Sequence, residues 1–183
     1  MASPALTVNG LTKQYGGHTA VDNLDVELPT GVVAGFVGPN GAAKTTTMAI
    51  LLGLVRPTAG TATVLGCTID QPAAYLHRVG ALVKSPAFHP SLSGADNLRM
   101  LAIVGGHQPA SIPGLLHLVG LAGRGDDPYR GYSLGMKQRL GIAVALLDDP
   151  ELLILDEPAN GLDPQGVRDM RGLIGSVADQ GRT

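Results

Sequence analysis

Apolar and polar positions in the first third of the chain predict strands followed by a helix. Residues 24–28 alternate leucine or valine with acids, the pattern of a strand with one buried face. Residues 32–37 (Val-Val-Ala-Gly-Phe-Val) are continuously apolar, which predicts a parallel strand buried on both faces. Residues 44–55 have a helical pattern, and Gly53 and Pro57 are expected to end that helix. This alternation of strands and helices favours an α/β fold.

The second half of the chain adds another buried strand and a region rich in helices. Residues 152–155 (Leu-Leu-Ile-Leu) form a second apolar run, followed directly by two acids. Residues from about 85 to 149 have helical patterns bounded by glycine- and proline-containing joints, so we interpret them as a helical insertion subdomain. Apolar residues recur at helical spacing over 167–177, which predicts a further helix.

Composition narrows the classes of protein to which the chain can belong. Its 183 residues, 44% of them apolar and 15% charged, are expected to form one globular domain over residues 1–183. A net charge of −2 gives no general attraction to nucleic acid or to anionic membranes, so phosphate must be bound by a local site. No apolar run approaches the roughly 20 residues that span a bilayer, and the N-terminus has no signal-peptide pattern. We therefore expect a cytoplasmic protein that acts at a membrane only through a partner.

A glycine-containing segment between the first apolar run and its helix has the composition of a phosphate-binding loop. Its residues are Gly38, Pro39, Asn40, Gly41, Ala42, Ala43, Lys44, Thr45 and Thr46. Glycines allow backbone N–H groups to form an anion-binding nest, and the helix N-terminus adds the positive end of its dipole. Lys44 is expected to reach the β- and γ-phosphates of a nucleotide, and the Thr45 hydroxyl to ligate Mg²⁺. Taken alone, the segment is also compatible with a structural strand-to-helix turn.

Two adjacent acids, Asp156 and Glu157, follow the second apolar run. The carboxyl edge of a parallel sheet is where ligands bind in open α/β folds. Asp156 is expected to hold Mg²⁺ through water, and Glu157 to act as the catalytic residue that orients or deprotonates the attacking water. Acids also end strands for structural reasons, but a lysine-bearing loop upstream in the same sheet favours the functional interpretation.

The segment before the second apolar run predicts a capped helix. Ser133 is a favourable N-cap residue, and Leu140, Val144 and Leu147 give the following helix an apolar side. The helix is expected to end before Asp149 and the proline that follows it.

This segment resembles the signature motif of ABC-family ATPases, in the variant typical of drug- and lantibiotic-export systems. The matching residues are Ser133, Leu134, Gly135, Met136, Lys137 and Gln138. Residues 38–46 resemble the family's Walker A motif, and residues 156–164 resemble its Walker B and D-loop, with Asp163 in the D-loop. Tyr15 stands where the family places an aromatic that stacks on adenine, and residues 85–90 resemble the region that contacts the membrane subunit. These motifs follow one another in the family's order over nearly the whole chain.

The resemblance implies a P-loop NTPase-type parallel-sheet core with an N-terminal antiparallel β part and a helical insertion subdomain. It implies ATP and Mg²⁺ as cofactors. It also implies a homo- or heterodimer in which the signature residues of one ATPase domain meet the γ-phosphate held by the Lys44 loop of the other. An integral-membrane permease is the other implied partner, without nucleic acid, and the implied location is peripheral on the inner face of the cell membrane. ATP hydrolysis is then expected to power transport, in particular export of a drug or peptide.

Three features depart from the family pattern. Ala43 replaces a loop glycine, and its methyl group is expected to limit the approach of the backbone to phosphate, or to be strained at positive φ. Lys84 stands where the family has a glutamine or glutamate, and a protonated lysine cannot ligate Mg²⁺. The family's histidine that contacts the γ-phosphate lies beyond Thr183, so the module is expected to be truncated at its C-terminus. We therefore expect the chain to bind Mg-ATP but to hydrolyse it weakly as it stands.

Two other functions are compatible with the sequence. The first is a non-transport ABC ATPase, but the long coiled-coil insertion, zinc cysteines or tandem ATPase domains of those relatives do not occur in the sequence. The second is a nucleotide-binding regulator or decayed paralogue without turnover, which Ala43 and Lys84 keep open. Separate measurements of ATP affinity and hydrolysis distinguish it from an active ATPase.

Overall fold

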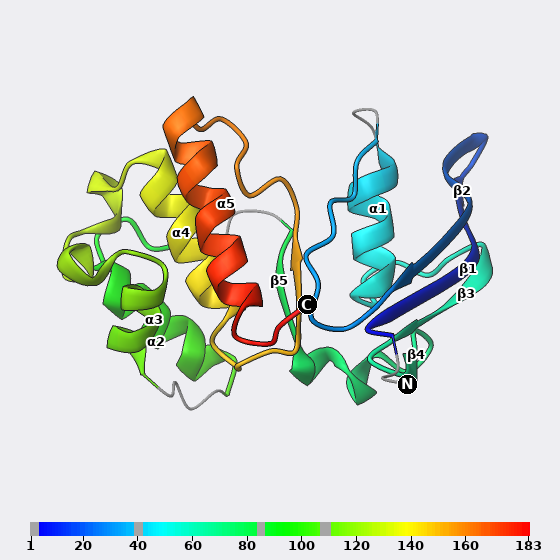
Figure 1. Ribbon diagram of the computed structural model, residues 1–183, viewed down its shortest axis with the longest axis horizontal. Helices are drawn as coiled ribbons and strands as arrows, with labels where there is room; N and C mark the ends of the chain where they lie inside the picture. The colour runs from blue at the N-terminus through cyan, green and yellow to red at the C-terminus, as the bar shows by residue number, and fades with distance from the viewer. Residues whose placement is uncertain (1–3, 39–41, 84–86, 107–110) are drawn as a thin grey trace.

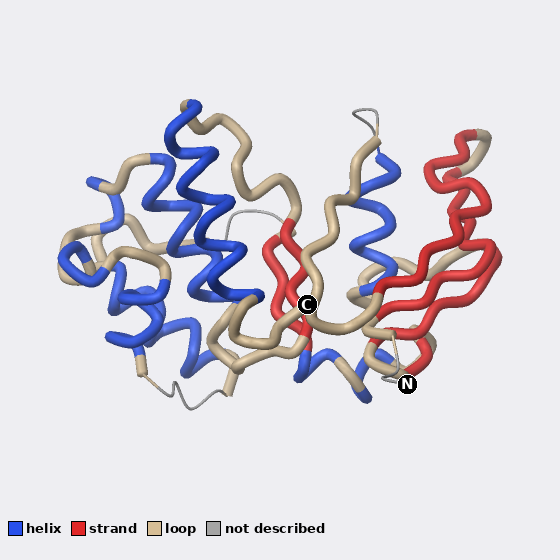
Figure 2. Tube along the Cα trace, viewed as in Figure 1, coloured by secondary structure: helices blue, strands red, loops and turns tan. Residues whose placement is uncertain are grey.

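Alternating apolar residues near the N-terminus build a four-stranded antiparallel sheet (Figures 1 and 2). The computed structural model describes residues 4–38, 42–83, 87–106 and 111–183. Strands β1 (Leu6–Tyr15), β2 (His18–Leu28), β3 (Ala59–Val64) and β4 (Cys67–Thr68) lie in the order β2-β1-β3-β4. The β1–β2 hairpin turns at Gly16, whose φ of 58° is left-handed and therefore suits glycine. This sheet matches the antiparallel part implied by the family resemblance.

The predicted strand at residues 24–28 and the predicted helix after the phosphate loop are both confirmed. In β2, the leucines and the valine of residues 24–28 are half-buried, whereas the two acids between them are exposed. Helix α1 (Ala42–Leu51) begins two residues earlier than the predicted helix at 44–55 and ends four residues earlier. Gly53, at φ 68°, adopts the left-handed conformation that commonly follows a helix C-terminus.

Two strands that are far apart in the sequence form a parallel pair. Strand β5 (Val79–Leu82) pairs with β6 (Leu152–Leu155) in unbroken register from Val79 opposite Leu152 to Leu82 opposite Leu155. The second buried strand predicted from the apolar run at 152–155 is therefore confirmed.

The first apolar run does not form the predicted parallel strand. Residues 32–38 belong to no helix or strand, and Val33 and Val37 are 59% and 92% exposed. A strand needs a hydrogen-bonded neighbour along its length. Residues 32–36 instead line an apolar cavity of about 920 Å³ that residues 152–156 also line. Because no ladder joins the described residues of this segment to β6, the apolar run stays irregular and exposed.

In the part of the chain that the structure describes, four helices cover the side of the parallel pair that faces away from α1. They are α2 (Gly94–Val104), α3 (Ile112–Leu118), α4 (Leu134–Ala145) and α5 (Pro164–Ala178). Short 3-10 turns connect the elements at Pro72–Ala74, Leu76–Arg78, Ala122–Arg124 and Tyr129–Gly131. Figure 1 shows these four helices on one side of β5, with α1 and the antiparallel sheet on the opposite side. Among the described residues, no helix combines the length and apolar character needed to cross a bilayer.

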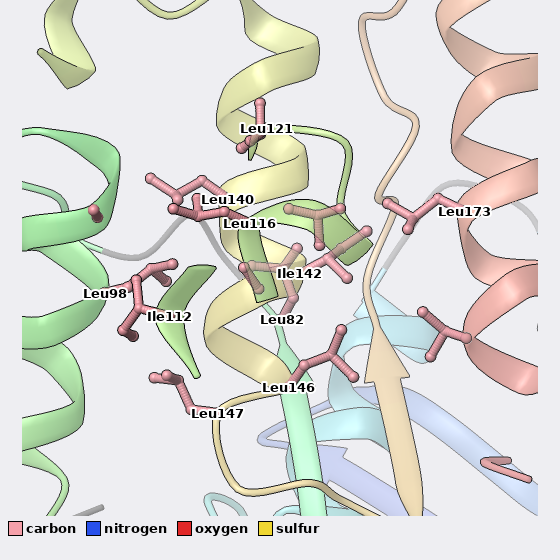
Figure 3. Packing of buried hydrophobic residues seen from close by; sticks show 14 of the residues in the cluster. Leu82, Leu98, Ile112, Leu116, Leu121, Leu140, Ile142, Leu146, Leu147 and Leu173 are labelled. Atoms are coloured by element: carbon pink, nitrogen blue, oxygen red, sulfur yellow. The ribbon is translucent and has the colours of Figure 1, made fainter. Parts of the chain in front are cut away.

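Buried leucine and isoleucine side chains hold these helices against β5 (Figure 3). The labelled members of this cluster are Leu82, Leu98, Ile112, Leu116, Leu121, Leu140, Ile142, Leu146, Leu147 and Leu173. The helix predicted over 167–177 is confirmed, since Met170, Leu173 and Val177 of α5 are buried in the same cluster. A second cluster lies between α1, the antiparallel sheet and β6.

Helix α4 offers a matched test of this core. Leu140 is fully buried, whereas Leu134, six residues earlier, is 47% exposed. Leu140→Ala is expected to lower the free energy of unfolding by about 2–5 kcal/mol because it leaves a cavity. Leu134→Ala is expected to cost about 0.5 kcal/mol. Urea unfolding followed by circular dichroism measures both, and equal losses would contradict the placement of α4 in the core.

Candidate nucleotide-binding site

The phosphate-loop lysine lies in the first turn of α1 and folds back over the segment that precedes it. Its Nζ donates a hydrogen bond to the carbonyl oxygen of Gly38 at 3.0 Å. The contact holds the ammonium group of Lys44 close to the N-terminal end of the helix, where two sources of positive potential reinforce each other. Pro39, Asn40 and Gly41, which were predicted to form the loop, lie outside the described residues, as do Lys84, Ser85 and Pro86.

The strain expected at Ala43 is absent. Ala42 and Ala43 begin α1, and the Ala43 carbonyl accepts a hydrogen bond from the Thr47 hydroxyl at 2.8 Å. Left-handed φ values occur outside glycine at Asn23, Leu65, Asp149 and Glu157 among the described residues. A right-handed helical backbone accommodates a methyl group at Ala43 without steric cost. Thr46 is buried beneath this turn.

A hydrogen bond joins the phosphate-loop helix to the end of β6. The Thr45 hydroxyl donates to Oδ2 of Asp156 at 2.8 Å, across 111 positions of sequence. Asp156 is held in place by its backbone N–H, which donates to the Leu82 carbonyl at 2.8 Å and extends the parallel ladder beyond β6. A hydroxyl oxygen and a carboxylate oxygen at this separation are the hard donors that Mg²⁺ prefers, with phosphates and water completing its octahedron. The two residues that were predicted to hold magnesium are thus adjacent.

Glu157 leaves β6 in an unusual backbone conformation. Its φ is 48°, and its side chain is exposed to solvent. The side-chain amide of Asn160 donates to Glu157 Oε2 at 3.1 Å, and the Asn160 backbone N–H donates to the Glu157 carbonyl at 3.0 Å. Asn160 was not among the site residues predicted from the sequence. The signal available in the sequence was its position three residues after a candidate catalytic acid, because a turn brings residues at that spacing close together.

The signature-like residues form the capped N-terminus of α4. The Ser133 hydroxyl accepts from the Met136 N–H at 3.3 Å, which confirms the predicted N-cap. Leu134 is exposed, while Gly135, Met136 and Gln138 are half-buried.

The buried Tyr132 directly precedes this cap, and the half-buried Tyr129 packs against its ring. The Tyr132 hydroxyl donates to the Arg124 carbonyl at 2.7 Å, and burial, followed by the nearby Asp127, raises the pKa of Tyr132. Burial also raises the pKa of Tyr129, whose ring lies 5.2 Å from the Lys137 ammonium. Both phenols therefore stay neutral near pH 7.

The N-terminus of α5 lies across a second cavity from the N-terminus of α4. The cavity measures about 460 Å³, and residues 133–136 and 161–163 contribute to its wall. Asp163, predicted as the D-loop residue, caps α5 by accepting from the Gly166 N–H at 2.7 Å. The structure thus brings the signature and D-loop residues together around one space.

The remaining predicted residues that the structure describes neither belong to the Thr45–Asp156 pair nor line the cavity between α4 and α5. Tyr15 ends β1 with its side chain 48% exposed, and the Lys13 ammonium lies 4.9 Å from its ring. Phe88, from the region resembling a membrane-subunit contact, packs on Tyr129 with ring centroids 4.8 Å apart. Within the described part of the chain, no group of three or more His, Cys, Asp or Glu side chains is arranged to hold a metal ion.

The lysine loop and the signature helix are separated within one chain. Figure 1 shows α1 and α4 on opposite sides of β5. Within one chain, the lysine, threonine and acids therefore lie apart from the Ser133 cap.

The chain is similar to known ATP-binding proteins of transporters. The model of the ABC transporter family matches residues 21–160. The bacitracin transport ATP-binding protein BcrA of Bacillus licheniformis is 45% identical over 180 residues, which are 97% of this chain and 59% of that protein. The lantibiotic transport ATP-binding protein SrtF of Streptococcus pyogenes is 40% identical over 97% of this chain and 77% of its own. The chain thus spans about three fifths of the length of BcrA.

Solved structures agree on the fold. An ATP-binding subunit of an ABC transporter superposes with a TM-score of 0.78 at 28% identity, over 97% of this chain and 76% of the other. The ADP conformation of MJ1267, an ATP-binding cassette of an ABC transporter, gives a TM-score of 0.87 over all of this chain and 80% of the other, at 21% identity. The predicted P-loop α/β fold is confirmed by these likenesses, and the family match confirms the resemblance drawn from the motifs. The chain belongs to the ABC transporter family of ATP-binding proteins.

Proposed function

We propose that this chain binds Mg-ATP and hydrolyses it to power transport across a membrane, as the ATPase subunit of an exporter of drugs or peptides. The observation that carries the proposal is the hydrogen bond from Thr45 to Asp156 beside the Lys44 ammonium. Through this contact, the Lys44 ammonium, which suits phosphate, lies close to the Thr45 and Asp156 oxygens, which suit Mg²⁺. Glu157 follows directly after Asp156. The similarity to proteins named for bacitracin and lantibiotic transport supports the class of cargo.

Each residue has a distinct part in the proposed reaction. Lys44 neutralises the β- and γ-phosphates, and the loop N–H groups and the α1 dipole complete the anion site. Thr45 and Asp156 hold Mg²⁺, directly and through water, which supplies further neutralisation of the phosphate charge. Glu157 orients the attacking water and accepts its proton. Tyr15, exposed at the end of β1, offers a flat apolar face to adenine.

A second ATPase domain completes the site. The α4 N-terminus presents the Ser133 hydroxyl, backbone N–H groups and a positive dipole end, which together suit a γ-phosphate. Because α4 lies across β5 from α1, this end serves a nucleotide bound to another copy or to a homologous domain. The proposed partner surface for the permease is the segment at residues 85–90, of which the structure describes residues 87–90, including Phe88. That partnership places the subunit at the inner face of the membrane.

Lys44→Ala tests the phosphate site. We expect its affinity for Mg-ATP to fall about 10- to 100-fold, the loss that follows removal of a charge-assisted hydrogen bond. Isothermal titration calorimetry with a slowly hydrolysed ATP analogue measures this change. Arg99→Ala is the control, because Arg99 donates to the Asp96 carboxylate on α2, away from the proposed site, and should leave affinity within about twofold. Equal affinities for the wild type and Lys44→Ala would refute the proposed site.

Thr45→Val tests the metal role separately from the phosphate role. Valine keeps the shape of threonine but removes the oxygen, so the gain in nucleotide affinity on adding Mg²⁺ should shrink by about tenfold. Affinity measured in EDTA should stay unchanged, and Thr45→Ser should retain the gain. A Thr45→Val protein with the full magnesium effect would remove Thr45 from the metal site.

Mixing two inactive variants tests the head-to-tail dimer. Lys44→Ala removes one half-site and Ser133→Arg blocks the other, so each variant alone should lack ATPase activity. A mixed dimer contains one site with both halves intact, and turnover should return to about a quarter of the wild-type rate if the sites act independently and the subunits pair at random. Steady-state phosphate release measures the recovery. Recovery should disappear when both substitutions are placed in the same chain, and its absence from the mixture would contradict a shared site.

A further inference from the structure

Asn160 contacts Glu157 twice, once through its backbone and once through its side chain. The backbone N–H donates to the Glu157 carbonyl at 3.0 Å and closes a turn over residues 157–160. The side-chain amide donates to Glu157 Oε2 at 3.1 Å. The turn fixes where the glutamate side chain begins, and the amide fixes where its carboxylate lies.

The carboxylate of Glu157 needs such a contact. Its side chain is exposed, so close packing does not restrict its rotamers, and holding a glutamate in one rotamer costs conformational entropy. Its φ of 48° also directs the side chain away from the path that an extended strand would give it. An amide N–H is a suitable partner because it donates to an ionised carboxylate and carries no charge that would compete with Mg²⁺.

We propose that Asn160 is a positioning residue that holds the Glu157 carboxylate through Oε2 and so presents Oε1 to the attacking water. The inference rests on the proposed role of Glu157 as the group that accepts a proton from water. Within the described part of the chain, the hydrogen bonds that Asn160 donates both go to Glu157. Its loss should therefore slow the chemical step and leave nucleotide binding intact.

Asn160→Ala removes the amide, and Asn160→Asp keeps its size but replaces the donor with a second carboxylate. We expect kcat to fall about tenfold in Asn160→Ala, the effect of one charge-assisted hydrogen bond. We expect a larger fall in Asn160→Asp, because like charges repel at this distance. KM and the dissociation constant of Mg-ATP should stay within about twofold in both variants. Arg99→Ala is the matched control: Arg99 also donates to an exposed carboxylate three residues away, at Asp96, but it lies on α2.

A double-mutant cycle separates positioning from a general structural role. In the Glu157→Gln background, Asn160→Ala should cause no further loss of single-turnover rate, because the two residues act as a unit. An additive loss, or wild-type kcat in both Asn160 variants, would overturn the proposal. Nitrogen-15 spectra test the contact without any turnover: the Asn160 side-chain amide signal, assigned by its absence in Asn160→Ala, should shift in Glu157→Ala. An unmoved signal would also overturn the proposal.

Failure of the proposed function has a different signature. If Glu157→Gln hydrolyses ATP at the wild-type rate, Glu157 is not the catalytic residue, whatever the Asn160 variants show. If Glu157→Gln is inactive while both Asn160 variants match the wild type, the function stands and the positioning role falls.

Discussion

The hydrogen bond between Thr45 and Asp156 joins the two halves of this molecule at the point where its chemistry is proposed to occur. Thr45 belongs to α1, which packs on the antiparallel sheet, and Asp156 belongs to the end of β6, which pairs with β5. A single hydrogen bond contributes only about 1 kcal/mol to stability. Its importance is geometric, because it sets the distance between the lysine-bearing helix and the acids.

Strand β6 gives that contact its rigidity because it belongs to both apolar clusters. Leu152 and Ile154 are buried with α1 and the antiparallel sheet, whereas Leu153 and Leu155 pack against the helical cluster. Successive side chains of a strand point to opposite faces, so four consecutive apolar residues tie the two sides together. The acids that follow are therefore carried on an element fixed from both faces, which is the support a precise site requires.

The sequence predicted the features that depend on a local pattern of residues. The prediction failed where the structure depends on contacts between residues far apart in the sequence. The half-buried alternation of residues 24–28, the Ser133 cap and the apolar face of α5 each follow from short-range periodicity, and all three are present. The strand predicted at 32–37 needs a ladder partner, which periodicity cannot supply, and the described residues leave a cavity there. Asn160 could not be predicted because its contact depends on a turn and on the positive φ of Glu157. The pattern of apolar residues indicates neither of these.

Charges at the helix N-termini distinguish the helices suited to phosphate from the others. Helix α5 is capped by the carboxylate of Asp163 and α2 carries Asp96 in its first turn, so in both a negative charge cancels the positive end of the dipole. Helices α1 and α4 have no acid in their first turns, and α4 is capped by the neutral hydroxyl of Ser133. Among the helices longer than seven residues, the two without an acid of their own at the N-terminus are thus those that carry the lysine loop and the signature residues. The carboxylate next to the first turn of α1, that of Asp156, comes from the end of β6 and is proposed to hold Mg²⁺. Because α1 and α4 lie on opposite sides of β5, the charge pattern itself favours a nucleotide shared between two domains.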